Sequence, residues 1–331
     1  MQSPAAEGPY FEDLTVGQQF TSAPGVTLSA GLAAVHQSIT GNRLALTLDD
    51  QLCREVTGGP GLASPSLIWD IAIGQSTVVT RQVKANLFYR GLAFRRLPRY
   101  LDTLRTSTRV EALRQNRQRD GRWPTGLAVL HITTTDQDEQ PVLDFWRCAM
   151  LPLRDPAAQT GRSDDIDAVG GPIRTEDLGE LVRDWRLLTF AHQTSGPRVD
   201  ELHPGQTWQV AGGDVVSGAT DLARLTLNIA AVHHDRAAAG GERLVYGGHV
   251  IGLALAQLTR SLPSVVTVAG WHACEHLGPV REGDTLRSTV SVERVDLLPD
   301  AGGLVHLRSQ VRADAAQPRA VLDWRYVVVL A

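Results

Sequence analysis

The sequence predicts an α+β protein made of two copies of one domain, each a curved antiparallel sheet wrapped around a buried helix. Three observations support this prediction. Segments repeat at a long and nearly constant spacing, each copy contains one helix that is apolar on nearly every side, and later segments alternate apolar and polar residues. The length of 331 residues also fits about two domains of roughly 150 residues each.

Three pairs of segments carry the repeat. They are VGQQF at 16–20 with PGQTW at 204–208, LDTLR at 101–105 with GDTLR at 283–287, and VLDFWRCAML at 142–151 with VLDWRYVVVL at 321–330. The order is conserved and the offsets are 188, 182 and 179 residues, so we expect a duplicated domain and not a short-period solenoid. The predicted domains are 10–152 and 185–331. A linker rich in Pro, Gly and acidic residues, with a short helix near its end, joins them at 153–184.

Each copy has the same order of predicted elements. A short strand (18–22 and 207–210) precedes a helix (29–39 and 219–231) and a Gly/Pro-rich passage. A longer helix follows at 64–76 and 247–259, and its apolar surface predicts that it is buried. About three strands close each copy; 285–295 and 304–311 alternate as half-buried antiparallel strands do.

Composition excludes several classes of function. The chain is 43% hydrophobic and 21% charged, no apolar run approaches the ~18 residues of a membrane span, and the net charge of −4 argues against nucleic-acid binding. Cys53, Cys148 and Cys274 are isolated, so we expect neither disulfides nor a zinc site, and a reducing cytoplasmic location. The motifs of serine hydrolases, nucleotide-binding proteins and zinc proteases are absent.

Three segments together resemble one known family. They are YFEDLTVGQQF at 10–20, VYGGHVIGLALA at 245–256 and GPVREGDTL at 278–286. The chain resembles the MaoC-like (R)-specific hydratases and dehydratases over nearly its whole length outside the linker. Within that family it is most similar to mesaconyl-CoA hydratases (β-methylmalyl-CoA dehydratases) and to uncharacterised actinobacterial double-hotdog proteins. The resemblance implies a double-hotdog fold, an acyl-CoA or acyl-carrier-protein thioester as substrate, no cofactor or metal, and a monomer or homodimer.

The resemblance also implies where catalysis takes place. The hydratase motif of the family has Asp and His five residues apart, a spacing that falls on Asn228 and His233 in the second copy and on Asn42 and Thr47 in the first. We therefore expect the second copy to carry the site. His233 can act as the base that takes a proton from water, and Asn228 can orient the water but cannot exchange protons. In an ideal helix the two side chains would point about 140° apart, so a break between them is expected.

The glycine pair at the start of the second long helix is the other catalytic candidate. Gly247 and Gly248 allow close approach of a thioester, and unpaired amides at a helix N-terminus suit an oxyanion. We assign that role to the amides of Gly248 and His249. Tyr246 and His276 are further candidates for contact with the substrate. The structural alternatives are a tight turn at the glycines, a packed tyrosine and a structural histidine.

Basic residues without acidic neighbours gather at 81–99. Guanidinium groups bind phosphates well, so Lys84, Arg90, Arg95 and Arg96 are candidates for binding coenzyme A. The first copy would then be the binding half of the protein. The alternative for each residue is a solvated basic surface.

The predicted function is that of an enoyl-CoA hydratase or 3-hydroxyacyl-CoA dehydratase, with a mesaconyl-CoA-like acyl group suggested by the resemblance alone. A degenerate, non-catalytic acyl-CoA-binding protein is the first alternative, because both motif positions have Asn in place of Asp. A hotdog thioesterase is the second, although no acidic group is clearly placed to activate water. His233 as a core histidine and Asn228 as a residue that closes a helix remain the structural alternatives.

Overall fold

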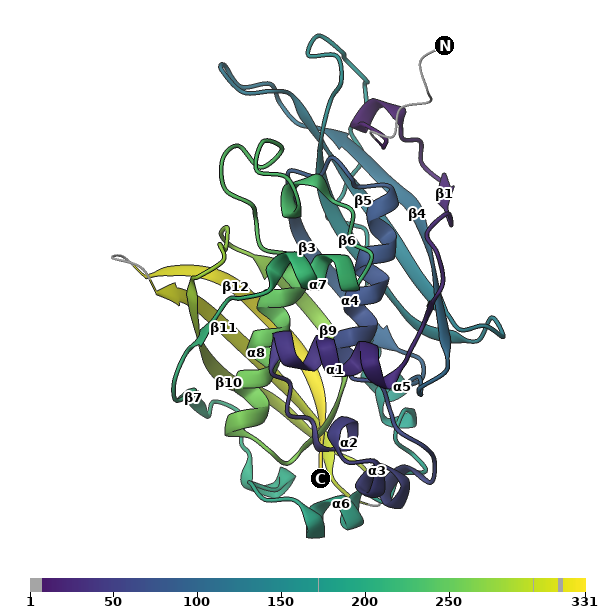
Figure 1. The fold of residues 1–331 in the computed structure, drawn as a ribbon, viewed down its shortest axis with the longest axis vertical. Coiled ribbons are helices and arrows are strands. Elements are labelled where there is room, and N and C mark those ends of the chain that lie inside the picture. Colours follow the sequence, from purple (N-terminus) through teal and green to yellow (C-terminus); the bar gives the residue numbers. More distant parts are fainter. Residues whose placement is uncertain (1–7, 172, 300, 315–317) are drawn as a thin grey trace.

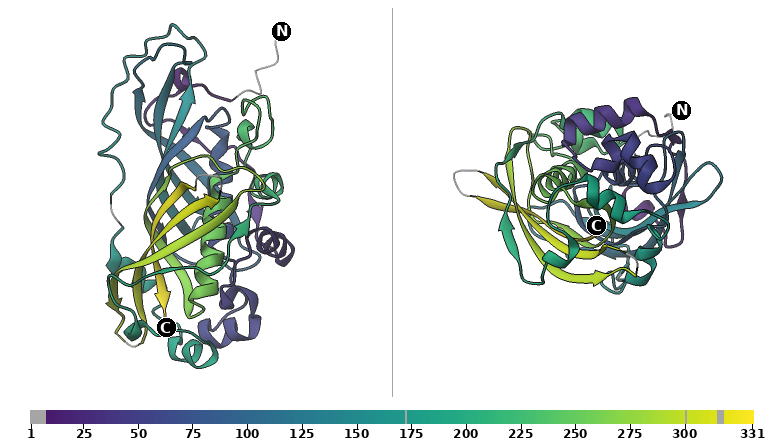
Figure 2. Two further views of the ribbon diagram at one scale, coloured as in Figure 1. Left: turned by 90° about the vertical axis from the view of Figure 1, so that its left-hand side faces the viewer. Right: turned by 90° about the horizontal axis from the view of Figure 1, so that it is seen from below.

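A computed structural model describes residues 8–171, 173–299, 301–314 and 318–331. Within these residues the strands form one antiparallel sheet in the order β1-β4-β5-β6-β3-β9-β12-β11-β10-β7. The sheet curves around two long helices, and the remaining helices lie on the same side (Figures 1 and 2). This architecture confirms the predicted α+β class.

Each copy contributes four long strands, one more than predicted. They are β3 (Ala85–Phe94), β4 (Thr103–Gln115), β5 (Thr125–Thr135) and β6 (Pro141–Pro152), then β9 (Val265–His276), β10 (Thr285–Leu297), β11 (Gly303–Asp314) and β12 (Arg319–Leu330). Short strands extend both edges: β1 (Gln19–Phe20) and β2 (Val26–Thr27) pair with β4, and β7 (Thr207–Gln209) and β8 (Asp214–Val215) pair with β10. Antiparallel pairing of β3 with β9 joins the two copies into one sheet.

The long buried helices are α4 (Pro65–Gln75) and α8 (Gly247–Ser261). Every residue of α4 is buried, as its uniformly apolar sequence predicts. Gln75 and Gln257 occupy equivalent places on the two helices. Each donates its side-chain amide to a carbonyl of the following strand, Leu104 O at 3.1 Å and Leu286 O at 2.9 Å. The same buried hydrogen bond in both copies supports the duplication inferred from the sequence.

Shorter helices precede each long helix. The first copy has α1 (Ala30–Thr40), α2 (Ala45–Leu48) and α3 (Asp50–Thr57), and the second has α7 (Ala219–Leu225) and the 3₁₀ turn η4 (Ala231–His233). The helix predicted at 219–231 therefore ends early. Its chain turns at Leu227, a non-glycine residue with a positive φ of 58°.

The segment between the two copies runs along the outer face of the sheet (Figure 2). Arg90 of β3 donates to the carbonyl of Asp167, and the side chain of Ile173 lies close to Gly270 of β9. The segment contains the short helix α5 (Thr175–Glu180) near its end, as predicted, and is followed by α6 (Leu187–Gln193). The remaining 3₁₀ turns are η1 (Phe11–Asp13), η2 (Ser76–Val78) and η3 (Val199–Glu201). Pro172 of the predicted linker lies outside the described residues.

Aromatic side chains fill the core where α4 meets the second copy. The Trp69 ring lies 4.8 Å from that of Trp271 and 6.1 Å from that of Trp324 between centroids. Tyr326 stacks on Trp324 at 3.6 Å. This cluster closes the space between α4 and the sheet of the second copy.

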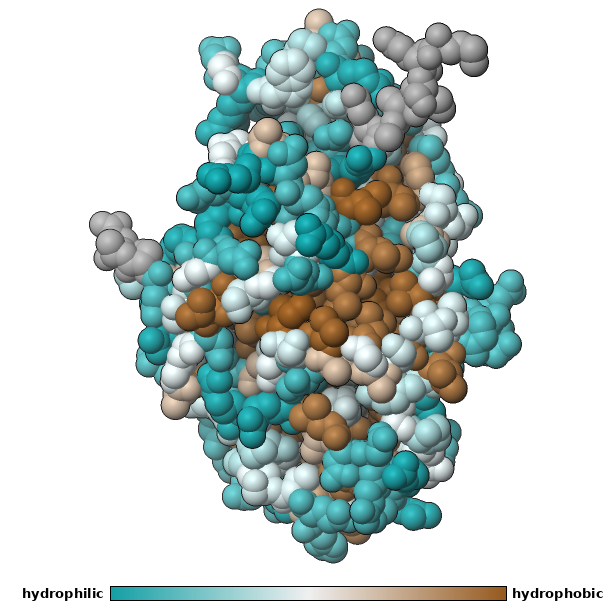
Figure 3. Space-filling model, in the orientation of Figure 1, coloured by the Kyte–Doolittle hydropathy of each residue, from teal (hydrophilic) through white to brown (hydrophobic). Residues whose placement is uncertain are grey.

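The surface over α1 and α7 is largely apolar (Figure 3). Val35 of α1 and Ile229, just after α7, are among the exposed large hydrophobic residues. Among the described residues, no helix is both long and apolar enough to cross a membrane.

Candidate active site

The two motif asparagines adopt the same local structure. The side-chain oxygen of Asn228 accepts from the amide of Ala230 at 3.0 Å, and that of Asn42 accepts from the amide of Leu44 at 3.0 Å. Each bond closes a turn after a helix, as Asn side chains commonly do. The chain bends between Asn228 and His233 as the geometry required, but the oxygen of Asn228 is used in the turn. Asn228 is buried and does not line the cavities described below.

His233 is held with one ring nitrogen free for chemistry. Its Nδ1 lies 2.9 Å from the carbonyl oxygen of Leu244. Because a carbonyl only accepts, Nδ1 carries the proton and Nε2 holds the lone pair. Burial lowers the pKa of His233 to about 4, against a smaller opposing effect of the Leu244 carbonyl, and so keeps the ring neutral at physiological pH.

His233 lines a cavity of about 310 Å³ between the two copies. The first copy contributes the start of β3 and the residues before it, from Val83 to Asn86. The second copy contributes the segment around His233, the first turn of α8 and the end of β9 with the loop after it. His276, at the end of β9, lies in the wall, and its Nε2 has no hydrogen-bond partner among the described residues.

The glycine pair divides its roles differently from the prediction. Gly247 lines the cavity, and a Cβ there would lie 2.5 Å from Nε2 of His276. Gly248 faces the first copy instead, because a Cβ there would lie 1.9 Å from Oδ1 of Asp70 on α4. By their positions in the helix, the amides of both glycines lack a partner inside it. Gly247 is therefore the better placed of the two.

His249 and Tyr246 are occupied elsewhere, which argues against their predicted roles. The amide of His249 donates to the carbonyl of Tyr246 at 3.0 Å, and its imidazole is fully buried. The Tyr246 hydroxyl donates to the backbone carbonyl of Asp70 at 3.2 Å. The Tyr246 ring lies 5.8 Å from that of His233 and supports it from behind.

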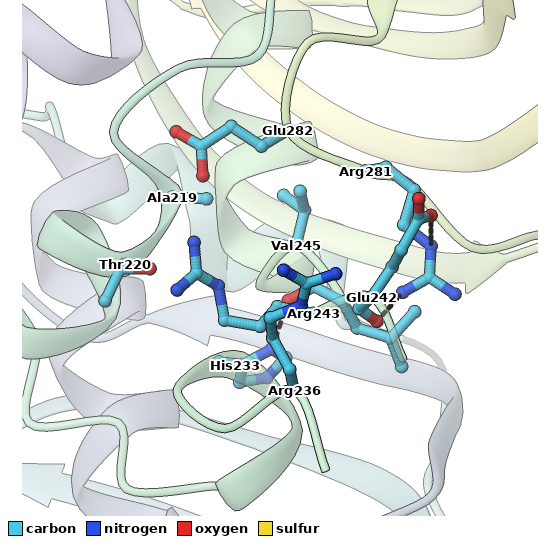
Figure 4. Close-up of a pocket in the computed structure, with 10 residues that line it drawn as sticks. Ala219, Thr220, His233, Arg236, Glu242, Arg243, Val245, Arg281 and Glu282 are labelled. Carbon is cyan, nitrogen blue, oxygen red and sulfur yellow. Dashed lines mark hydrogen bonds and ion pairs between the residues drawn. The ribbon is translucent and has the colours of Figure 1, made fainter. Parts of the chain in front are cut away.

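A second cavity of about 220 Å³ adjoins the first and shares His233, Leu244 and Val245 with it. Three arginines line this second cavity: Arg236, Arg243 and Arg281 (Figure 4). The Arg281 guanidinium is 3.6 Å from the carboxylate of Glu242, whereas Arg243 has no acidic partner among the described residues. The two cavities together lead from a basic surface to His233.

The basic residues predicted at 81–99 are mostly placed elsewhere. Arg95 pairs with Asp144 at 2.7 Å, Arg96 with Asp102 at 2.9 Å, and Arg90 lies 3.6 Å from Asp167 of the linker. None of the three lines either cavity, and their acidic partners satisfy them within the fold. Lys84 does line the larger cavity.

Sequence reasoning missed Arg236, Arg243 and Arg281. It searched for basic residues without acidic neighbours, and these three lie among Asp235, Glu242 and Glu282. A usable signal was present, since Arg236 and Arg243 fall between the two segments that carry His233 and Gly247.

The first copy has a cavity of about 220 Å³ at the place equivalent to the basic one. Ala33, Ala34 and Thr47 line it where Ala219, Thr220 and His233 line the other, at the repeat offset of 186 residues. Its wall has threonine in place of the histidine. Among the described residues, no group of three or more His, Cys, Asp or Glu side chains could hold a metal ion.

Comparison with known proteins agrees with this architecture. No family model matches the chain. It is 28% identical to the β-methylmalyl-CoA dehydratase of Chloroflexus aurantiacus (98% of this chain, 93% of the relative) and 26% identical to the mesaconyl-CoA hydratase of Cereibacter sphaeroides (94% and 91%). A conserved hypothetical protein of Mycobacterium tuberculosis, described as a double hotdog, superposes with a TM-score of 0.92 at 49% identity (99% of this chain, 100% of that one). A putative MaoC domain dehydratase of Chloroflexus aurantiacus superposes with a TM-score of 0.89 at 25% identity (99% of both).

The curved sheet around two central helices, with one histidine-bearing cavity between the copies, is that of a double hotdog. The chain belongs to the MaoC-like double-hotdog proteins.

Proposed function

We propose that the chain is a hydro-lyase that adds water to, or removes it from, the acyl group of a CoA thioester. The observation that carries this proposal is the placement of His233. Its Nε2 lone pair is available at a cavity whose opposite wall contains the start of a helix and a glycine. The names of the relatives, a dehydratase and a hydratase of CoA thioesters, support the same chemistry.

In the hydration direction, Nε2 of His233 takes a proton from water as the water oxygen bonds to Cβ. The electrons of the double bond move towards the thioester carbonyl, whose oxygen becomes negative. The helix-start amides at Gly247 and Gly248 stabilise that oxygen, because unpaired N–H groups and the helix dipole favour negative charge there. The proton on His233 then passes to Cα, and water has been added across the bond.

No carboxylate is needed for this sequence of steps. His233 both removes and returns the proton, and its neutral state at physiological pH suits the first step. Nε2 of His276, open on the same cavity, can hold the water by a hydrogen bond. Asn228 acts by shaping the turn that brings His233 to the cavity.

The basic cavity is suited to the phosphates of coenzyme A. Arg236 and Arg243 offer forked donors at its wall, and the cavity meets the acyl site at His233. A CoA thioester could then lie with its nucleotide among the arginines and its acyl group beside His233.

The test is hydration of 2-enoyl-CoA thioesters, crotonyl-CoA and mesaconyl-CoA included, by the wild type and by His233→Ala. We expect loss of the enoyl absorbance with the wild type and a rate about 10²–10⁴-fold lower with the variant. His203→Ala, an exposed histidine outside the site, is the matched control.

Two other outcomes would replace the proposal. Release of free CoA without a hydrated product would indicate a thioesterase. Tight binding of thioesters without turnover would indicate a non-catalytic binding protein, the class that the missing Asp of the motif also favours.

A further inference from the structure

Arg147, on β6, is a fully buried arginine without an acidic partner. Its side chain is 1% exposed. One terminal nitrogen donates to the hydroxyl of Thr80, and Nε has no hydrogen-bond partner among the described residues. The groups that act on its charge are the phenols of Tyr89 and Tyr246 and not a carboxylate. A buried guanidinium in this state is unfavourable unless something else supplies the negative charge.

Arg147 lies one layer behind the wall of the His233 cavity. It is opposite Tyr89 in the pairing of β3 with β6, so both side chains point to the same face of the sheet. The hydroxyl of Tyr89 also has no hydrogen-bond partner among the described residues. The Tyr89 ring lies 5.8 Å from that of His276, which lines the cavity. The charge of Arg147 reaches His233 as well, where it helps to lower the pKa of that ring.

Several open polar atoms therefore surround one end of the cavity. They are Nε of Arg147, the hydroxyl of Tyr89, Nε2 of His276 and the side-chain oxygen of Asn86. Buried polar atoms in folded proteins are nearly always paired. A cluster of unpaired ones beside a cavity is typical of a site that a ligand completes, and three of these four belong to groups that can donate a hydrogen bond.

The second copy shows what this place looks like when it is purely structural. In the aligned repeats Arg147 corresponds to Tyr326, and the register of strands makes Tyr89 correspond to Trp271. The Tyr326 hydroxyl pairs with that of Ser309 at 2.9 Å, and its ring stacks on Trp324. The fold of each copy therefore does not require an arginine at this position.

We propose that Arg147, Tyr89 and His276 bind a carboxylate at the far end of the acyl chain, so that the substrate is the CoA thioester of a 2-enedioic acid. This inference rests on the proposed function. With the thioester oxygen at the start of α8 and Cβ beside His233, a carboxylate carried on Cβ extends towards the deep wall. There it neutralises Arg147 and accepts hydrogen bonds from the guanidinium and from Tyr89.

The experiment compares two thioesters that differ only at this end. Mesaconyl-CoA carries a carboxylate on Cβ, and 2-methyl-2-butenoyl-CoA carries a methyl group there. We expect the wild type to favour the carboxylate by about 10²-fold in kcat/KM, and Arg147→Gln to lose most of that preference. Arg147→Lys should retain part of it. Tyr89→Phe, which removes one oxygen and is safe for folding, should reduce it about tenfold.

Lys84→Gln is the matched control, because Lys84 is also a cation at this cavity but lies on its exposed side. It should change the rates with both thioesters equally and leave the preference intact. Binding of the saturated analogues, 2-methylsuccinyl-CoA and 2-methylbutyryl-CoA, is measured in parallel by calorimetry because it does not depend on turnover.

The outcomes separate this inference from the proposed function. Equal rates with both substrates, or an unchanged preference in a folded Arg147→Gln or in Tyr89→Phe, would overturn the carboxylate site while leaving the hydratase intact. If neither substrate is hydrated but the saturated carboxylate analogue binds better in an Arg147-dependent way, the carboxylate site stands and the hydratase fails. Equal binding of the two analogues would refute the inference. Should Arg147→Gln fail to fold, Tyr89→Phe decides.

Discussion

The two halves of the molecule share a framework and differ at the positions where chemistry would take place. Asn42 and Asn228 close the same turn, and each is followed by a short helical turn at the repeat offset. That turn ends with Thr47 on one side and His233 on the other. A shared turn thus presents a base in one half and an inert hydroxyl in the other.

The starts of the two long helices differ in the same sense. The second copy begins α8 with Gly247, whereas the first begins α4 with Pro65. Proline suits the first helical position because its missing N–H is not needed there. The same missing N–H removes a donor that an oxyanion could use. The first copy therefore lost two parts of the site by changes that cost its fold little.

The sheet differs in the opposite direction. Behind the His233 cavity the first copy has Tyr89 and Arg147 with open polar atoms, and the equivalent Trp271 and Tyr326 of the second copy belong to a closed aromatic cluster. The backbone bond from Ala231 to the Arg81 carbonyl, at 2.9 Å, ties the His233 turn to the first copy. One half therefore supplies the base and the other supplies the wall that it faces. Duplication allowed this division, since each half needs to maintain only one part.

The largest effect is expected from making the two halves alike. His233→Thr copies the residue of the first copy and should lower kcat about 10²–10⁴-fold, because no other base is placed beside the cavity. Adding Thr47→His to this variant should not restore activity, since that side still has Pro65 and the aromatic cluster. Both are measured as hydration rates.

Circular dichroism and gel filtration would verify that these variants are folded. Recovery of activity in the double variant would show that the two halves are equivalent and would contradict the division of labour.

A smaller loss is expected when the helix start of the first copy is transplanted to the second. Gly247→Pro removes the amide, and Gly247→Ala adds a side chain but keeps it; in both, Cβ approaches Nε2 of His276. Tyr246 has φ −61° and ψ 132°, which a following proline tolerates. We expect kcat to be about 10²–10³-fold lower with proline than with alanine. Equal rates in the two variants would mean that this amide does not bind the oxyanion.

Removing one arginine of the basic cavity should affect binding more than chemistry. Arg243→Ala should raise KM for a CoA thioester about tenfold and leave kcat nearly unchanged, because it removes one contact to a phosphate far from the reacting carbons. The increase should shrink at high salt. Arg308→Ala, whose guanidinium pairs with Asp323 on the sheet, is the control. A loss of kcat without a change in KM would place Arg243 at the reacting end.

The weakest effect is on stability and depends on pH. Burial lowers the pKa of His233, His249 and His276 to about 4, below the value near 6.5 of the unfolded chain. Between these values the unfolded state binds more protons, so the free energy of unfolding should fall as pH drops from about 6.5 to 4. Urea midpoints at pH 7 and pH 5 test this.

His249→Leu, which copies Leu67 of the first copy, should reduce that dependence without abolishing it. Activity should likewise be flat above about pH 6 and decline on the acid side, as protonation removes the lone pair of His233. A wild-type stability that does not change between pH 7 and pH 5 would contradict these shifts.

Much of the fold followed from the residue pattern. The repeat, the two apolar helices and the alternating strands are local signals, and local periodicity directly reports which face is buried. The asymmetry between Thr47 and His233 was also visible, because the repeat aligns them. The helix break before His233 followed from geometry, although its position at Leu227 did not.

Tertiary structure decided the use of each polar side chain. Asn228 closes a turn, Arg95 and Arg96 are satisfied by acids on neighbouring strands, and Arg147 stays unpaired behind the cavity of the other half. Whether an arginine is free depends on which carboxylates the sheet register brings beside it, often tens of residues away in the chain. A spacing motif carries no such information, since a buried charge is settled by its partners across the fold and not by its neighbours in sequence.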